Sequence, residues 1–183
     1  MKKITLLLVV GTLFLATATQ AQVSFGLKGG LNFSTADVDG LSVDSKTGYH
    51  FGAYAVIKAG PIGIQPEAYF SAQKLSADGE DVDLSYIQVP ILLRLGFAKI
   101  LYLNAGPQFG INTKAELGGG DIKDDIKGMD LSAALGAGLD LPMGLGAQVR
   151  YVKGLTNASE INGVDWKNAM FQVSVTYALF GNN

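Results

Sequence analysis

The chain has 183 residues, no cysteine and a formal net charge of −2 at pH 7. This length predicts a single domain. The lack of cysteine excludes a disulfide framework, and the lack of a basic excess argues against nucleic-acid binding. Apolar residues make up 48% of the chain and the mean hydropathy is +0.26, which is high for a soluble protein.

The N-terminal segment has the three parts of a secretory signal peptide. Lys2 and Lys3 form a charged start, residues 4–16 are apolar, and Thr19 and Ala21 are small residues at the −3 and −1 positions of a cleavage site. We therefore expect residues 1–21 to be removed on export through the Sec pathway, which leaves 22–183 as the mature domain. A retained membrane anchor is the alternative, and the short apolar run opposes it.

Beyond residue 21, apolar residues recur with a period of two, which is typical of strands whose two faces meet different surroundings. Ile91 and Leu93 share one apolar face, whereas Arg94 lies on the opposite, mixed face. The alternation predicts eight strands, at 23–33, 48–58, 61–73, 84–96, 99–112, 129–141, 143–153 and 168–180. Their lengths suit tilted membrane-crossing strands.

The predicted connections alternate between short and long. Three are tight turns, at Ala59-Gly60, at Phe97-Ala98 and at Pro142. Four are long and hold most of the acidic residues, at 34–47, 74–83, 113–128 and 154–167. The usual rule for such barrels puts short turns in the periplasm and long loops outside the cell.

An antiparallel meander of eight strands is expected to close into a barrel, because closure removes its edges. The apolar faces carry almost no charge, and rows of Leu, Ile, Phe and Val would overfill the narrow space inside eight strands. The sequence therefore predicts an all-β fold, an eight-stranded antiparallel up-and-down transmembrane β-barrel with its apolar face toward lipid. A soluble ligand-binding barrel, with apolar residues inside, is the alternative.

Charged residues also occur on the predicted polar faces of the strands. We expect six of them to form a polar network in the lumen: Lys28, Glu67, Arg94, Asp130, Asp140 and Arg150. Burying an unpaired charge costs several kcal/mol, so these groups should pair with one another. Such a network plugs a barrel instead of lining a wide channel.

Six segments of the chain resemble one known family. They are GLKGGLNFS (26–34), PEAYFS (66–71), YIQVPILLRL (86–95), LYLNAGPQFG (101–110), GAGLDL (136–141) and VRYVKGLTN (149–157). Together they are similar to the PorT-like outer-membrane β-barrel proteins of Bacteroidetes, over nearly the whole mature chain. The resemblance implies an eight-stranded barrel in the outer membrane of a Gram-negative cell. It implies little about activity, although the founding member is linked to machinery that secretes proteins.

The sequence contains no motif for catalysis, for a cofactor or for a metal. His50 is the only histidine, and no motif selects a nucleophile for it, so we interpret it as a hydrogen-bonded residue of the lumen or rim. The acidic run from Asp78 to Asp83 offers oxygen ligands of the kind that Ca²⁺ prefers. Its spacing does not match an EF-hand, and we interpret it as a solvated loop.

These features predict a small, monomeric, non-enzymatic outer-membrane barrel with a structural, adhesive or envelope-assembly role. Its expected partners are outer-membrane lipid, lipopolysaccharide and other envelope proteins that contact the acidic loops. A small porin-like channel is the alternative function.

Overall fold

The computed structural model describes residues 22–37, 43–45, 47–77, 80–97, 100–117, 120–121, 129–155 and 167–181. Its eight long strands are β1 (Gln22–Asp37), β3 (Thr47–Ala59), β4 (Ile62–Ala77), β5 (Glu80–Gly96), β6 (Leu101–Leu117), β8 (Met129–Asp140), β9 (Leu145–Gly154) and β10 (Lys167–Phe180). Two short strands, β2 (Val43–Ser45) and β7 (Gly120–Asp121), pair with β4 and β6. The predicted signal peptide, residues 1–21, lies outside the described residues and stays a prediction.

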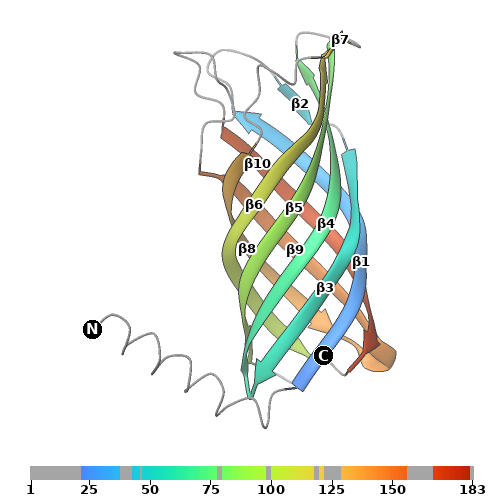
Figure 1. Ribbon diagram of the computed structural model, residues 1–183, viewed down its shortest axis with the longest axis vertical. Coiled ribbons are helices and arrows are strands. Elements are labelled where there is room, and N and C mark those ends of the chain that lie inside the picture. Colours follow the sequence, from blue (N-terminus) through green and yellow to red (C-terminus); the bar gives the residue numbers. More distant parts are fainter. Residues whose placement is uncertain are drawn as a thin grey trace, which may run out of the picture.

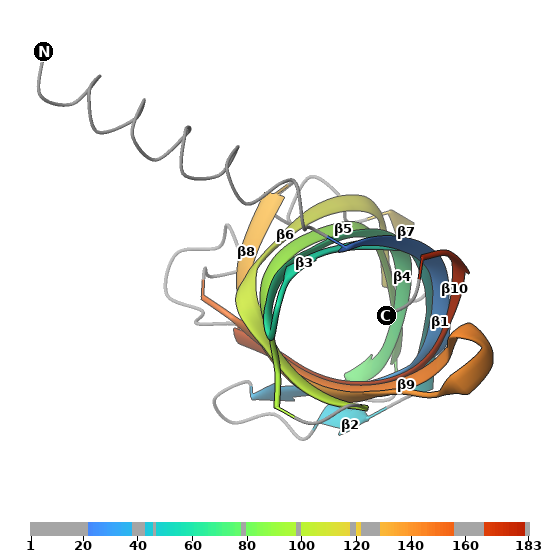
Figure 2. The same cartoon turned by 90° about the horizontal axis from the view of Figure 1, so that it is seen from below.

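The eight long strands form a closed antiparallel β-barrel, which confirms the predicted fold (Figures 1 and 2). Each long strand pairs with the next one along the chain, including β4 with β5. The first and last strands complete the ring, with Leu31 of β1 opposite Val173 of β10. No unpaired edge is left between these strands, so their backbone hydrogen bonds are satisfied within the wall.

Short turns gather at the end of the barrel where β1 begins and β10 ends (Figure 1). Gly60 and Pro61 join β3 to β4, and Gly60 has a φ of 65°, a conformation that favours glycine. A 3₁₀ turn, η3 (Pro142–Gly144), joins β8 to β9. We call this end the short-turn end and the opposite end the long-loop end.

The strands extend further toward the long-loop end than the sequence predicts. β4 reaches Ala77 and β5 begins at Glu80, so most of the predicted loop 74–83 is a continuing hairpin. The prediction failed there because the apolar alternation stops while the backbone pairing continues. The acidic run from Asp78 to Asp83, which we interpreted as a solvated loop, overlaps β5 from Glu80 to Asp83, but its side chains and the tip at 78–79 lie outside the described residues.

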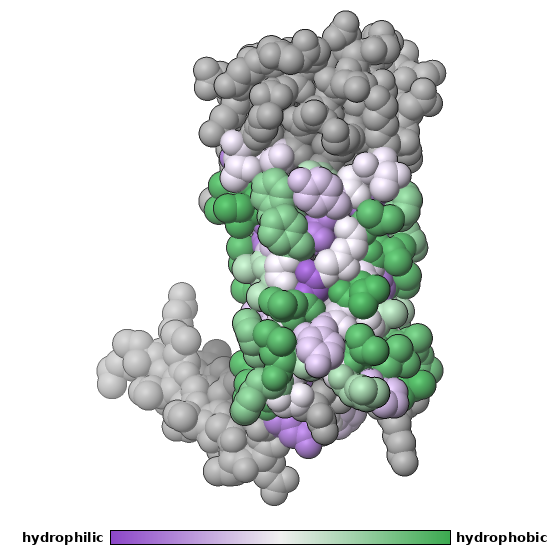
Figure 3. Space-filling model, turned by 90° about the vertical axis from the view of Figure 1, so that its right-hand side faces the viewer, coloured by the Kyte–Doolittle hydropathy of each residue, from purple (hydrophilic) through white to green (hydrophobic). Residues whose placement is uncertain are grey.

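The outer wall of the barrel is apolar. Leu93 is 51% exposed whereas the neighbouring Arg94 is 2% exposed, and Figure 3 shows apolar side chains over much of the strand region on one face. Tyr49, Phe51 and Phe70 form an aromatic group on this wall, with 5.6 Å between the ring centroids of Phe51 and Phe70. This orientation is the reverse of what a soluble ligand-binding barrel requires. No helix in the described part of the chain is long and apolar enough to cross a membrane.

Candidate functional site

The lumen is filled mainly by polar side chains, which alternate strand residues point inward. Its buried polar and charged members are Ser24, Lys28, Asn32, His50, Gln65, Glu67, Ser71, Gln88, Arg94, Asn104, Gln108, Asn112, Ser132, Gln148, Arg150, Gln172, Ser174 and Thr176. Such groups need partners in a space this narrow, because an unsatisfied buried polar group costs about 1–3 kcal/mol.

An ion cluster lies in the middle of the lumen. Glu67 of β4 accepts two hydrogen bonds from Arg150 of β9, at 2.6 and 2.9 Å, and one from Lys28 of β1, at 2.8 Å. All three side chains are at most 1% exposed. Gln148 also accepts from Arg150 at 3.0 Å. The cluster therefore connects three strands that are far apart in the sequence, across the interior of the barrel.

A second ion pair lies closer to the short-turn end. Arg94 of β5 pairs with Asp140 of β8, and its guanidinium carbon lies 3.5 Å from the centroid of the Tyr102 ring. Gln65 links this pair to the central cluster, since it donates to Glu67 at 2.7 Å and accepts from Arg94 at 3.1 Å. Five of the six residues expected in the lumenal network are thus joined in one hydrogen-bonded chain.

The sixth residue, Asp130, is not part of that chain. It lies on β8 near the long-loop end, and its Oδ1 is buried without a hydrogen-bond partner among the described residues. The sequence placed Asp130 on the correct face, but ten residues along β8 separate it from Asp140 at the other end. Among the described residues, Asp130 therefore stands apart from the five linked residues, and its place in the network stays a prediction.

His50 holds three strands together near the middle of the lumen. Its Nδ1 lies 2.7 Å from Asn32 Oδ1, and its Nε2 lies 2.8 Å from Ser174 Oγ. A serine, a histidine and an amide in this order have the connectivity of a nucleophile, a base and an orienting group. However, Asn32, His50 and Ser174 are 0%, 1% and 2% exposed. A substrate has no approach to this serine, so the arrangement serves packing.

The apolar part of the lumen has little signal in the sequence. Leu92, Ala134, Val152 and Met170 are buried together inside the barrel. Leu92 stands on the mixed face of its strand in the sequence, but nothing in the pattern shows that residues from β5, β8, β9 and β10 meet. Their contact depends on strand register, which the alternation alone does not determine.

Glycines make room for aromatic rings in the lumen. A Cβ atom at Gly138 would lie 2.3 Å from the Tyr102 hydroxyl, and one at Gly26 would lie 2.7 Å from Cε1 of the Tyr54 ring. Tyr102 and Tyr54 are both 3% exposed. The glycines of the polar faces therefore let large side chains fill a barrel of this size.

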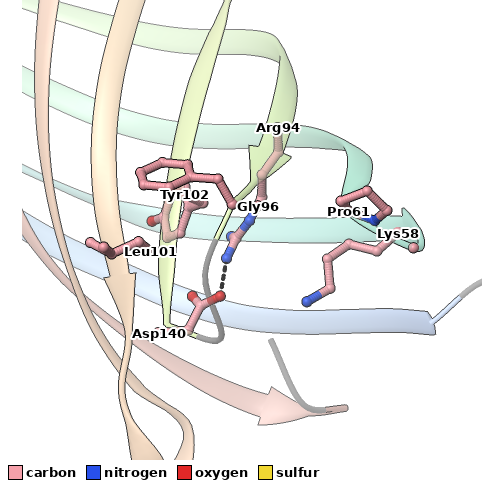
Figure 4. Close-up of a pocket in the computed structure, with 9 residues that line it drawn as sticks. Lys58, Pro61, Arg94, Gly96, Leu101, Tyr102 and Asp140 are labelled. Carbon is pink, nitrogen blue, oxygen red and sulfur yellow. Dashed lines mark hydrogen bonds and ion pairs between the residues drawn. The ribbon is translucent and has the colours of Figure 1, made fainter.

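A cavity of about 390 Å³ opens at the short-turn end. It is lined by Lys58, Gly60, Pro61, Arg94, Gly96, Phe97, Leu101, Tyr102 and Asp140. Figure 4 shows Lys58 extending from one wall toward the Arg94–Asp140 pair on the other. We call this cavity the vestibule. Within the described part of the chain, no group of three or more His, Asp or Glu residues is arranged to hold a metal ion.

Known structures share this fold. Ail, the attachment invasion locus protein of Yersinia pestis, matches in its complex with the heparin analogue sucrose octasulfate. Its TM-score is 0.55 and its identity 15%, over 86% of this chain and 99% of that chain. Neisserial surface protein A matches with a TM-score of 0.54 and 15% identity, over 85% of this chain and 97% of that chain. At such identities the likeness shows the fold alone.

Curated protein sequences include no significant match to this chain. A family model, described as the outer membrane protein beta-barrel domain, matches residues 5–178. The match covers almost the whole chain and agrees with the apolar outer wall and the polar lumen. The chain therefore belongs to the outer membrane protein beta-barrel domain family.

Proposed function

We propose that this protein is a non-enzymatic, non-conducting barrel that acts as a contact protein of the outer membrane. The observation that carries this proposal is the central ion cluster. Lys28, Glu67 and Arg150 come from three strands and meet across the lumen with almost no exposure. Because these paired charges occupy the cross-section of the lumen, the loops and the outer wall are the surfaces through which the barrel contacts other molecules.

The contact surface in this proposal is the long-loop end, which faces outside the cell. Most acidic residues of the chain fall in the segments that the sequence assigns to long loops. Acidic loops suit basic protein partners and cation-bridged contacts with lipopolysaccharide. Ail is named as an attachment invasion locus protein, and its structure was solved in complex with a heparin analogue. A comparable adhesive role here is consistent with the shared fold, but the ligand would differ, because acidic loops repel sulfated sugars.

We also infer that the chain is a PorT-like member of its family, and that it assists an envelope assembly as a monomer. Segments such as YIQVPILLRL (86–95) and LYLNAGPQFG (101–110) support this inference. Affinity isolation from native membranes of the source cell tests it. A reproducible envelope partner that is lost when loop acids are replaced by amides supports the assembly role, and a failure to recover any partner opposes it.

Planar-bilayer recording tests the closed lumen. The wild-type barrel should show no steady conductance, whereas the triple variant Lys28→Ala, Glu67→Ala, Arg150→Ala should conduct if it folds. Steady wild-type current that falls when Gly136→Trp fills the lumen would overturn the proposal and favour a small pore.

One observation favours that second candidate. Asn104 and the Gln148 amide nitrogen are buried without hydrogen-bond partners in the described region. Water molecules would satisfy these groups, and a connected file of water could conduct small ions.

A further inference from the structure

The vestibule at the short-turn end carries an unbalanced positive charge. Lys58 and Arg94 line it with a single carboxylate, that of Asp140. Arg94 is already paired with Asp140 and Gln65, whereas Lys58 feels the charge of Asp140 without forming a hydrogen bond or ion pair with any described residue. Figure 4 shows the Lys58 ammonium directed into the cavity between the two walls.

The imbalance continues deeper into the lumen. From Lys28 to the short-turn end, the described cations are Lys28, Lys58, Arg94 and Arg150, and the described carboxylates are Glu67 and Asp140. One positive charge therefore remains uncompensated in the confined space of the vestibule, among Lys58, Arg94 and Asp140, and another in the central cluster, among Lys28, Glu67 and Arg150. Confinement of this kind strengthens the attraction for an anion, because water and salt screen it less.

The vestibule also has a shape and an apolar side that suit an organic ligand. Its volume of about 390 Å³ is within the range of small-molecule sites, roughly 300–1,000 Å³. Pro61, Phe97 and Leu101 line it beside the charged groups. Gly63 faces the stem of Lys58, where an added Cβ would lie 2.9 Å from the lysine Cγ. A side chain at position 63 would push the lysine from its place.

We propose that the vestibule binds a small organic monocarboxylate. Its carboxylate would lie between Lys58 and Arg94, and its apolar part against Phe97 and Leu101. The local surplus is one positive charge, which a carboxylate neutralises, whereas a phosphate monoester brings a charge of about −1.5 to −2 at neutral pH. Because the proposed function places the long-loop end outside the cell, the vestibule at the short-turn end opens toward the periplasm. Binding itself does not depend on whether the lumen conducts, so failure of either idea leaves the other testable.

The test uses sodium hexanoate as the probe, with the folded barrel in nanodiscs of neutral phosphatidylcholine at low salt. Amide NMR shifts of Gly60 and Gly96, which line the vestibule, report binding. 1-Hexanol is the neutral control for the apolar part and for partition into lipid. Lys58→Met removes the charge and keeps a similar stem. Lys153→Met is the matched control, because Lys153 is exposed on β9 near the long-loop end.

We expect saturable shifts with hexanoate, a loss of affinity of about tenfold in Lys58→Met, and no change in Lys153→Met. Asp140→Asn should tighten binding, because it removes the competing carboxylate and keeps an oxygen acceptor for Arg94. This gain keeps the test decisive if Lys58→Met folds poorly. The proposal is overturned by the absence of saturation, by equal affinities in the two lysine variants, by weaker binding in Asp140→Asn, or by 1-hexanol binding as tightly as hexanoate.

Discussion

Arg150 holds Glu67 through both of its terminal nitrogens, with Nη1 2.9 Å from Oε2 and Nη2 2.6 Å from Oε1. The two residues lie on β9 and β4, which are not neighbours in the barrel wall. Their contact therefore crosses the lumen, and it fixes the distance between opposite walls. Such a bidentate pair is geometrically specific as well as strong.

Glu67→Gln should destabilise the barrel strongly. The change leaves Arg150 and Lys28 buried with positive charge and no carboxylate between them. We expect a loss of about 3–5 kcal/mol in the free energy of unfolding, the usual cost of breaking a buried ion pair on one side. Equilibrium unfolding by denaturant in lipid vesicles measures this loss. An unfolding curve equal to that of the wild type would contradict the role given to the central cluster.

Asp130→Asn makes the same chemical change at an inward-facing position outside the network, which makes it the matched control. Asp130 has no ion pair with a described residue and its Oδ1 is unsatisfied. Removing an uncompensated buried charge should leave stability unchanged or raise it by about 1 kcal/mol. The same unfolding measurement applies, and a loss as large as that of Glu67→Gln would show that Asp130 has an essential partner.

Gly138→Ala should strain the packing of the lumen at the short-turn end, since the new Cβ would lie 2.3 Å from Tyr102. Overpacking of this kind costs about 1–3 kcal/mol, and Tyr102→Leu should recover part of it by removing the ring. Gly29→Ala is the control, because an added Cβ there meets only the His50 carbonyl oxygen, at 3.7 Å. Denaturation in vesicles should separate the two alanine variants, and equal stabilities would contradict the tight fit.

Ser174 should be chemically inert despite its contact with His50. Its side chain is buried in the lumen, so a fluorophosphonate probe, which reacts with activated serines, should leave the folded barrel unlabelled. Mass spectrometry of the labelled peptides is the measurement. Labelling of Ser174 that disappears in His50→Ala would instead establish a reactive serine and contradict the non-enzymatic proposal.

The barrel was predictable because one physical cause acts on every strand. Lipid on one side and a narrow lumen on the other impose a period of two, so the alternation alone places Leu93 and Arg94 on opposite faces, as the structure has them. The strand ends beyond the membrane were not predictable, since backbone pairing continues there without an apolar face. This is why β4 and β5 are longer than expected.

The sequence predicts that the charges inside the lumen form pairs, but it does not predict which residues pair. Buried charges must find partners, but which partners they find depends on register and on contacts across the barrel. Nothing in the sequence links Lys28 to Glu67, 39 residues away, or separates Asp130 from the others. The vestibule was missed for the same reason: its lining comes from four separate stretches of the chain, and only the fold shows that Lys58 lies near Arg94.

The central claim is that the barrel wall is apolar toward lipid and polar within. Because the chain lacks cysteine, Leu93→Cys accepts a single nitroxide spin label, and power-saturation electron paramagnetic resonance in bilayers measures its surroundings. We predict that the label at position 93 collides freely with oxygen dissolved in the lipid and is shielded from a water-soluble nickel chelate. A label reached readily by the nickel chelate and poorly by oxygen would contradict the membrane-facing wall.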